Sequence, residues 1–196
     1  MPVSLVVGLG NPGREYANTR HNAGFRTVDA WAAKLGVSFS AEPALKGEFA
    51  KAAFCGAPLW LAKPTTYMND SGECVGAFAR FRKIDISEVA VVYDDITLPP
   101  GTLKISLGGG DGGHNGIKSL IRCCGNAFMR VRIGIGPKIH REQDLADFVL
   151  GKLTPEEQAL FASRTEHYIY GIELLASRGL VAAQNTLNIH QKNERS

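Results

Sequence analysis

The chain has 196 residues, 44% of them hydrophobic and 21% charged, which is enough to build one globular domain with a sizeable core. Its formal net charge of +3 permits a polyanionic partner without demanding one, because local patches of charge matter more than the sum. The apolar opening, residues 3–7, is too short to span a membrane and lacks the basic start of a signal peptide. We therefore expect a cytoplasmic protein without a transmembrane segment.

The cysteines and histidines show none of the spacings that are typical of zinc sites. The four cysteines include no CxxC pair, and the five histidines form neither HExxH nor HxxxH. Cys123 and Cys124 are adjacent in the chain, which makes them poor partners for a disulfide. We therefore expect reduced thiols and no bound metal.

Hydrophobic periodicity predicts strands that alternate with helices. In the first half of the chain we expect a buried strand over 3–7, a helix over 21–35 that ends at Gly36, a hairpin of strands 48–54 and 59–62 around 56–58, and a helix capped by Ser71. A buried strand over 89–93, a loop over 98–101 and a strand over 102–107 are expected next. The remaining elements are a short helix over 117–124, a strand around 131–135, and a C-terminal helix.

The start of the C-terminal helix has the clearest local signal. Thr154 suits the N-cap, Pro155 the first helical position, and Glu157 the third, which together form a capping box. The alternation of strands and helices predicts an α/β fold, a single domain with a twisted mixed β-sheet flanked by helices. We place this domain at 1–190 and a polar C-terminal tail at 191–196.

The segment GLGNPG at 8–13 fits the G-x-G-x-x-G pattern of dinucleotide-binding loops. Pro12 removes a backbone donor from this loop, and a polar stretch over 14–20 separates its third glycine from the next helix. The acidic residue expected about twenty positions later is also missing, since Asp29 lies within the helical pattern. The segment GIKS at 116–119 departs similarly from a P-loop, and GxSxG is absent.

Four longer segments carry the strongest functional signal. They are GLGNPG at 8–13 followed by YANTRHNAG at 16–24, KPTTYMNDSG at 63–72, YDDITLPPG at 93–101, and GGGDGGHNG at 108–116. In this order and at these separations, the segments resemble the bacterial peptidyl-tRNA hydrolase family. RVRIGIG at 130–136 and DFVLG at 147–151 also match, so the resemblance extends from about Ser4 to about Asn188.

The resemblance implies a single α/β domain around a twisted mixed sheet that works as a monomer, without a metal or an organic cofactor. The implied activity is translation-related: cleavage of the ester bond that joins a peptide to tRNA, which rescues tRNAs that have dropped off the ribosome. By resemblance His21 is the catalytic base and Asp94 the carboxylate that orients it. Asn11, Asn69 and Asn115 form a polar frame around them.

These residue types suit ester hydrolysis, which needs an activated water and a stabilised oxyanion. Free histidine titrates at about 6.5, so at neutral pH it is mostly available as a base. A positioned base contributes about 10²–10⁴-fold, and a carboxylate on the other ring nitrogen fixes the tautomer. Amides donate without changing charge, and a donor aimed at the oxyanion is worth roughly 3–4 kcal/mol. Which asparagine holds the water and which meets the oxyanion stays open.

The substrate is expected to lie against aromatic and thioether side chains. Tyr67 and Met68 would pack against the esterified amino acid or the terminal ribose and base, with Tyr16 on the opposite wall. The glycines of 108–113 let the backbone approach the acceptor end closely. His114 is expected to line the substrate site in a structural rather than a catalytic role.

Lys104 and Arg132 match the basic pair with which the family senses the 5′-phosphate of tRNA, a contact that positions RNA without reading its sequence. Three positions depart from the family pattern. Thr97 replaces a common Asp, so a hydrogen bond or charge near the catalytic carboxylate would be lost. Asp111 adds a negative charge that weakens RNA approach or pairs with a nearby base, and Ser106 stands where some relatives are basic.

Three other functions remain as alternatives. The first is a non-catalytic RNA-binding relative of the same fold, like the plant splicing factors of the family. The second is a dinucleotide-dependent oxidoreductase built on 8–13, and the third is an esterase or peptidase for small substrates. The presence of all five expected catalytic residues favours the hydrolase over the RNA-binding relative.

Overall fold

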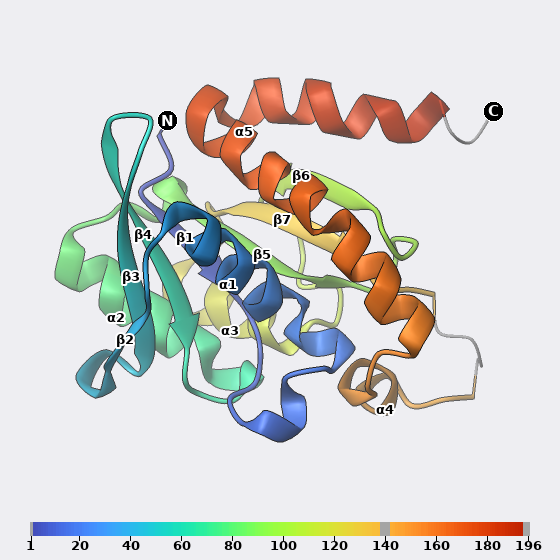
Figure 1. Ribbon diagram of the computed structural model, residues 1–196. Coiled ribbons are helices and arrows are strands. Elements are labelled where there is room, and N and C mark those ends of the chain that lie inside the picture. The colour runs from blue at the N-terminus through green and yellow to red at the C-terminus, as the bar shows by residue number, and fades with distance from the viewer. Residues whose placement is uncertain (1, 138–141, 194–196) are drawn as a thin grey trace.

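A computed structural model describes residues 2–137 and 142–193, with side chains through Asn188. Its strands are β1 (Leu5–Gly8), β2 (Ser40–Glu42), β3 (Gly47–Phe54), β4 (Ala57–Pro64), β5 (Val89–Asp95), β6 (Leu103–Leu107) and β7 (Met129–Gly134). Its α-helices are α1 (Ala23–Leu35), α2 (Ser71–Arg82), α3 (Asn115–Cys124), α4 (Leu145–Leu150) and α5 (Pro155–Asn193). Short 3₁₀ turns over Arg14–Tyr16, Arg20–Asn22 and Met68–Asp70 join some of them (Figure 1).

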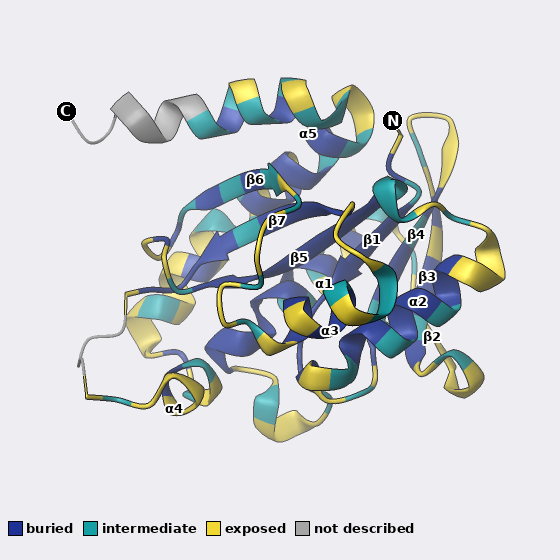
Figure 2. Cartoon of the chain, turned by 180° about the vertical axis from the view of Figure 1, so that it is seen from behind, coloured by how far each residue is buried: buried dark blue, intermediate teal, exposed yellow. Residues whose placement is uncertain are grey.

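The strands form one mixed sheet in the order β2-β3-β4-β1-β5-β7-β6. The four central strands β4, β1, β5 and β7 are parallel, whereas β3 pairs with β4, β2 with β3, and β6 with β7 in antiparallel fashion. Helices cover both faces, α1 and α5 on one side and α2 and α3 on the other (Figures 1 and 2). The predicted α/β fold, one domain around a mixed sheet, is confirmed.

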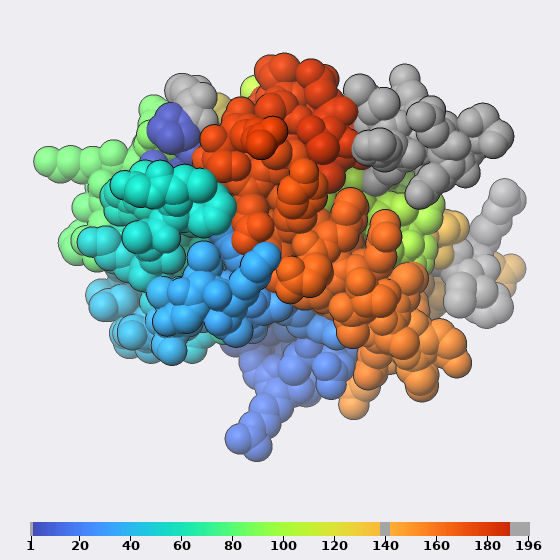
Figure 3. Space-filling view, turned by 45° about the horizontal axis from the view of Figure 1, so that its top comes forward, coloured from blue at the N-terminus to red at the C-terminus, as the bar shows by residue number. Residues whose placement is uncertain are grey.

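Alternate residues of the central strands fill two separate cores. Leu5 and Val7 of β1 pack beneath α2 and α3, whereas Val6 packs beneath α1 and α5. In β5, Val91 and Val92 divide in the same way, and all of these side chains are fully buried. Burial on both faces explains why the parallel strands appear as continuous apolar runs in the sequence. In Figure 3, α5 forms a ridge across its face of the molecule beside α1.

Most predicted elements are found, with two local corrections. The hairpin turns at Cys55 and Gly56 rather than at 56–58, because both residues adopt the positive φ angles, 49° and 79°, that a two-residue hairpin turn needs. Ser71 is the first residue of α2 and does not cap it, since its hydroxyl donates to the Met68 carbonyl. Strand β2 and helix α4 have no counterpart among the predicted elements.

Helix α5 consists of two helical segments that are joined by a kink. Gly179 interrupts it with φ 81°, a left-handed conformation that favours glycine, and the helix changes direction there (Figure 1). The helical backbone continues through Asn193, and the rest of the predicted tail, residues 194–196, lies outside the described residues. None of the helices in the described chain combines the length and the apolarity that crossing a membrane requires.

The predicted capping box at the start of α5 is present and also carries an ion pair. The Thr154 and Glu157 side chains each bond to the other residue's backbone N–H, at 3.2 and 2.8 Å. Both oxygens of Glu157 also accept from the Arg20 guanidinium, at 3.0 and 2.8 Å. Arg20 donates further to the Phe148 carbonyl and stacks on the Phe148 ring. Arg20, the residue before His21, is therefore bonded to both α4 and α5.

We expect Glu157→Gln to lower the free energy of unfolding by about 1–3 kcal/mol, because the amide can still cap the helix but leaves the largely buried Arg20 without its carboxylate. Urea unfolding would measure the change. The matched control is Glu156→Gln, an exposed carboxylate in the same turn, for which a change within about 0.5 kcal/mol is expected. Equal effects of the two variants would contradict this role for Arg20.

The sheet brings the sequence motifs to one edge. Strands β1, β4 and β5 run in parallel, so the segments that follow them emerge side by side, where ligands of α/β folds bind. The glycine segment 108–113 reaches this edge differently. Leu107 of the antiparallel β6 pairs with Met129 at the start of β7, so the segment begins at the opposite edge. It then leads to His114, whose ring contacts Asp94.

Candidate active site

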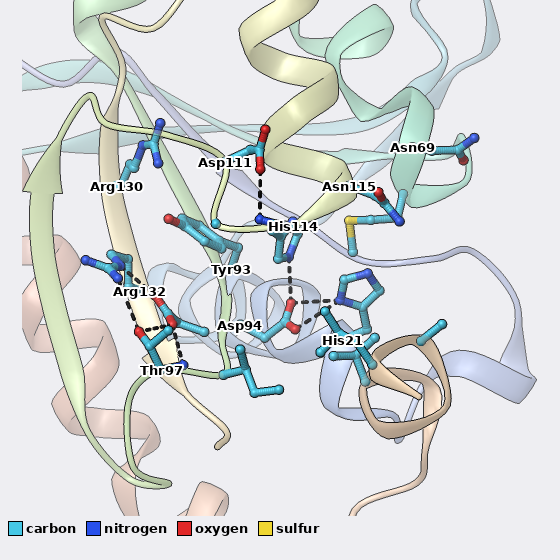
Figure 4. Close-up of a pocket in the computed structure, with 18 of the residues that line it drawn as sticks. His21, Asn69, Tyr93, Asp94, Thr97, Asp111, His114, Asn115, Arg130 and Arg132 are labelled. Carbon is cyan, nitrogen blue, oxygen red and sulfur yellow. Dashed lines mark hydrogen bonds and ion pairs between the residues drawn. The ribbon is translucent and has the colours of Figure 1, made fainter. Parts of the chain in front are cut away.

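A buried carboxylate between two imidazoles lies at the centre of the site. His21 comes from the turn before α1, Asp94 from the end of β5, and His114 from the residue before α3. The Nδ1 atom of His21 is 3.0 Å from both Asp94 oxygens, and the Nε2 atom of His114 is 2.9 Å from Oδ1 (Figure 4). The three side chains are only 8%, 2% and 9% exposed.

The hydrogen bonds fix which ring nitrogens carry protons. Burial alone would raise the pKa of the Asp94 carboxyl, but the two imidazoles hold its pKa well below its ordinary value. Asp94 is therefore a carboxylate that accepts from both rings. The Nδ1 atom of His114 accepts the Ile117 N–H at 3.3 Å, so its hydrogen resides on Nε2, toward Asp94. When His21 donates from Nδ1, its Nε2 keeps a free lone pair and can serve as a base.

Asn11 is held by the residues around it. Its Oδ1 atom accepts from the Met68 N–H at 2.7 Å, which joins the first glycine loop to the turn before α2. Asn22, next to His21, closes a two-bond ring with the Asn11 backbone, both bonds being 2.9 Å. The Asn11 side chain, which lines the pocket, is thus fixed in direction.

Asn69 and Asn115 lie on the rim of the same pocket. Asn69 belongs to the turn before α2, Asn115 is the first residue of α3, and both are exposed (Figure 4). Within the part of the chain that the structure describes, no hydrogen bond involves either amide. Both amides are therefore available to a ligand.

The pocket has a volume of about 1140 Å³ and is lined by several separate segments of the chain. Tyr16 and Tyr67 meet edge to face, with ring centroids 6.5 Å apart, so they share one wall and Tyr16 does not lie on the opposite wall as predicted. Tyr67 is 61% exposed. Met68, which is buried, contributes to the floor. Another wall is α4, which presents four apolar side chains to the pocket: Leu145, Ala146, Val149 and Leu150.

The far end of the pocket is basic. Arg132 of β7 lines it and donates from Nε to Asp95 at 2.6 Å. Lys104 lies directly across from Arg132 in the β6–β7 pair, beside the pocket rather than in its lining. The site thus joins a His–Asp pair, three amides and a cationic end in one continuous cleft.

Comparison with known proteins identifies the family of this chain. The family model for peptidyl-tRNA hydrolase matches residues 5–195. The chain belongs to the peptidyl-tRNA hydrolase family. It is 42% identical to the peptidyl-tRNA hydrolase of Nitrosomonas europaea, covering 98% of this chain and 99% of that one. It is 44% identical to that of Mycobacterium tuberculosis, covering 94% and 96% of the two chains.

A solved structure extends the likeness to three dimensions. The crystal structure of peptidyl-tRNA hydrolase from Acinetobacter baumannii superposes with a TM-score of 0.89 at 38% identity, covering 95% of this chain and 94% of the other. The resemblance that the sequence motifs indicated is therefore confirmed. Membership supports an enzyme that hydrolyses peptidyl-tRNA, a carboxylic ester hydrolase of class EC 3.1.1.29, over the non-catalytic relative.

The family's first glycine segment has a packing role in this structure. The third glycine, Gly13, leads into a 3₁₀ turn and not into a helix. A Cβ atom on Gly8 would lie 2.5 Å from the backbone oxygen of Gly24 in α1, and one on Gly24 would lie 2.2 Å from the Val92 carbonyl oxygen. Only glycine lets α1 approach the strands this closely, which brings His21 to the end of β5. The structure therefore favours packing over dinucleotide binding as the explanation of this motif.

Two departures from the family pattern have local explanations. The Thr97 hydroxyl and N–H both bond to Oδ1 of Asp95, at 2.6 and 2.8 Å, so Thr97 serves the neighbouring carboxylate and makes no bond to Asp94. Asp111 accepts from the Gly113 N–H at 2.8 Å and forms a turn within the glycine segment. It is not paired with a basic side chain in the described chain.

Sequence reasoning missed Arg130, which holds the glycine segment in place. This residue of β7 is 4% exposed, and it donates to the Gly110 carbonyl at 2.6 Å and to the Gly109 carbonyl at 2.8 Å. It also donates to Asn126 at 2.7 Å. Alternation along β7 could have indicated its role, since Arg130 and Arg132 share one face of the strand.

The two histidines and Asp94 also form a set of possible metal ligands. Their ligand atoms lie within 4.8 Å of one another, and two imidazoles with one carboxylate suit zinc. Sequence spacing did not reveal this group, because His21 and His114 are 73 and 20 residues away from Asp94. A metal held by Asp94 and the two ring nitrogens nearest to it would need the nitrogens whose hydrogens Asp94 now accepts. It would therefore compete with the bonds that orient His21.

Proposed function

We propose that this chain cleaves peptidyl-tRNA with a water molecule, without a metal or an organic cofactor. His21 is the base that activates the water, and Asp94 orients His21. The observation that carries the proposal is the buried His21–Asp94 pair at the floor of a pocket with polar amides on its rim. A carboxylate held on one ring nitrogen stabilises the imidazolium that forms when the other nitrogen accepts a proton.

The reaction proceeds in two steps. Nε2 of His21 accepts a proton from water while the water oxygen bonds to the ester carbonyl carbon, and the carbonyl oxygen becomes an oxyanion. The bond from that carbon to the ribose oxygen then breaks, and the imidazolium returns its proton to the ribose oxygen. The products are a free peptide and a tRNA with an intact terminal hydroxyl. Asp94 stays ionised throughout because the imidazoles lower its pKa.

The asparagines supply neutral hydrogen bonds to the reacting groups. Oxyanion stabilisation needs donors that are fixed before the reaction begins. Asn11 meets this requirement, because the bond from the Met68 N–H to its Oδ1 atom fixes the direction in which its side-chain nitrogen points. We therefore assign to Asn11 the role of donating to the oxyanion. Asn69 and Asn115, exposed on the rim, hold the attacking water and the acyl group.

The acceptor end of the tRNA occupies the rest of the pocket. Tyr16 and Tyr67 offer aromatic faces and edges to the terminal base or the esterified side chain, above the floor that Met68 provides. His114 lines the site and shares Asp94, so its role is to hold that carboxylate. The glycine segment lets the RNA backbone approach without colliding with side chains.

The experiment that tests this function is product analysis with an N-acetyl-aminoacyl-tRNA. The proposal predicts release of the N-acetyl-amino acid and a tRNA that its synthetase can charge again, which shows that the ester and not the RNA was cut. Binding of the tRNA with the ester left intact would instead support a non-catalytic RNA-binding protein.

Lys104 and Arg132 bind the tRNA 5′-phosphate in this proposal. Replacing either with Ala should weaken tRNA binding and reduce the slope of log affinity against log salt by about 1, while kcat at saturation stays close to that of the parent. Affinities measured over a series of salt concentrations would check this. Lys51→Ala, a change on β3 away from the pocket, is the control. An unchanged salt slope would contradict the phosphate contact.

We further propose that the protein works as a monomer in the cytoplasm. All the proposed catalytic side chains come from one chain, so no second copy is needed to complete the site. Light scattering should give a mass near the 21.1 kDa of a single chain.

A further inference from the structure

Arg132 is held by two side chains of the segment that follows Tyr93 in β5. Its Nε atom donates to Oδ2 of Asp95 at 2.6 Å, and its NH2 atom is 3.5 Å from the Thr97 hydroxyl. The side chain of Arg132 is 24% exposed and that of Asp95 is 9% exposed. In Figure 4, Arg132 and Thr97 lie across the pocket from His21.

Asp95 is itself rigidly placed. Its Oδ1 atom accepts both the N–H and the hydroxyl of Thr97, at 2.8 and 2.6 Å, which leaves Oδ2 to the arginine. Its backbone carbonyl accepts the Ile135 N–H across the sheet at 3.1 Å. A carboxylate bound at so many points acts as a fixed anchor, unlike a mobile surface counter-ion.

The geometry leaves the phosphate-binding edge of Arg132 usable. A guanidinium presents its donors in a rigid planar fork and binds phosphate through two parallel N–H bonds. Asp95 engages Nε, so the outer edge formed by NH1 and NH2 is the one directed away from the carboxylate. A flexible arginine would lose side-chain entropy on binding phosphate, whereas the bond to Asp95 already restricts the Arg132 side chain.

The surrounding charges favour an anion at this place. Lys104 lies opposite Arg132 in the neighbouring strand, and the next residue on the same face of β7 is Arg130. Asp95 supplies one negative charge against these cations. A phosphate monoester with a charge of about −1.5 to −2 at neutral pH therefore still meets a positive surface.

We infer that Asp95 is a positioning residue that sets how strongly the enzyme prefers tRNA with a 5′-phosphate, by holding Arg132 in its phosphate-binding orientation. This inference rests on the proposed contact between Arg132 and that phosphate. Asp95 takes no part in the chemistry of the ester, since Asp94 alone faces the two histidines.

The test compares kcat/KM for N-acetyl-aminoacyl-tRNA carrying a 5′-phosphate with that for the same tRNA after phosphatase treatment. The ratio of the two values is measured for the wild type, Asp95→Asn, Arg132→Ala and the double variant. Asn keeps an acceptor for the Thr97 N–H but not the charge that anchors Arg132. Thr97→Val, which keeps the shape of the turn and leaves the carboxylate intact, is a second and milder variant.

We expect Asp95→Asn to lower the phosphate preference by about 3- to 10-fold, within the range of couplings measured between groups of one network. Thr97→Val should lower it less, and activity on dephosphorylated tRNA should stay near the wild-type value in both. In the double variant, Asp95→Asn should add nothing to Arg132→Ala. An unchanged or increased preference in Asp95→Asn would overturn the inference while leaving the phosphate contact in place. If Arg132→Ala kept the wild-type preference for 5′-phosphorylated tRNA, both the phosphate contact and the inference would be overturned.

Discussion

His21→Ala should lower kcat for peptidyl-tRNA by about 10²–10⁴-fold or more, because it removes the base that we propose accepts the proton of the attacking water. The loss should appear in kcat, since the imidazole acts on the transition state and contributes little to holding the tRNA. Single-turnover hydrolysis of an N-acetyl-aminoacyl-tRNA at saturating enzyme would isolate this chemical step from binding.

Two controls keep the His21 result interpretable. The affinity of His21→Ala for tRNA should stay close to that of the wild type, which shows that the pocket is still formed. His167→Ala, a histidine on α5 outside the pocket, should leave the rate unchanged. A rate within a few-fold of the wild type in His21→Ala would mean that another group activates the water.

Asp94→Asn should cost about 10²–10⁴-fold in kcat, although the new side chain has nearly the same shape. The amide has one acceptor oxygen where two imidazoles now donate to a carboxylate. His114 keeps its hydrogen on Nε2 because Ile117 occupies Nδ1, so the two rings compete for that oxygen. The amide N–H₂ would then favour the His21 tautomer with its hydrogen on Nε2, which cannot accept a proton from water.

The Asp94→Asn result needs a control substitution at another aspartate and a measurement of which ring nitrogen of His21 carries the hydrogen. Asp85→Asn, an exposed cap before the same strand, should have no effect on kcat. The ¹⁵N shifts of the His21 ring should change from hydrogen on Nδ1 in the wild type to hydrogen on Nε2 in Asp94→Asn. Normal turnover together with an unchanged tautomer would contradict the role of the carboxylate.

The sequence predicted the fold well because its strongest patterns have direct physical causes. Strands buried on both faces need unbroken apolar runs, and the capping box at Thr154 satisfies backbone donors that any helix start exposes. Short elements were missed for the same reason. Strand β2 has three exposed residues, and α4 has six residues, too few to show a helical period.

The candidate site was predicted as a set of residues but not as a network. The motifs nominated His21 and Asp94, and the structure brings the two side chains together. They could not show that His114 shares the carboxylate, that Arg130 holds the glycine segment, or that Asp95 holds Arg132. Such bonds join residues far apart in the chain, and their directions follow from packing that no local pattern encodes.

The most direct measurement compares hydrolysis of an N-acetyl-aminoacyl-tRNA with that of the same free aminoacyl-tRNA, in the presence of EDTA. We predict rapid cleavage of the N-blocked substrate alone, at a rate that EDTA does not lower. Loss of cleavage in EDTA, with recovery on adding a divalent metal, would contradict a mechanism in which His21 and Asp94 activate the water without a metal.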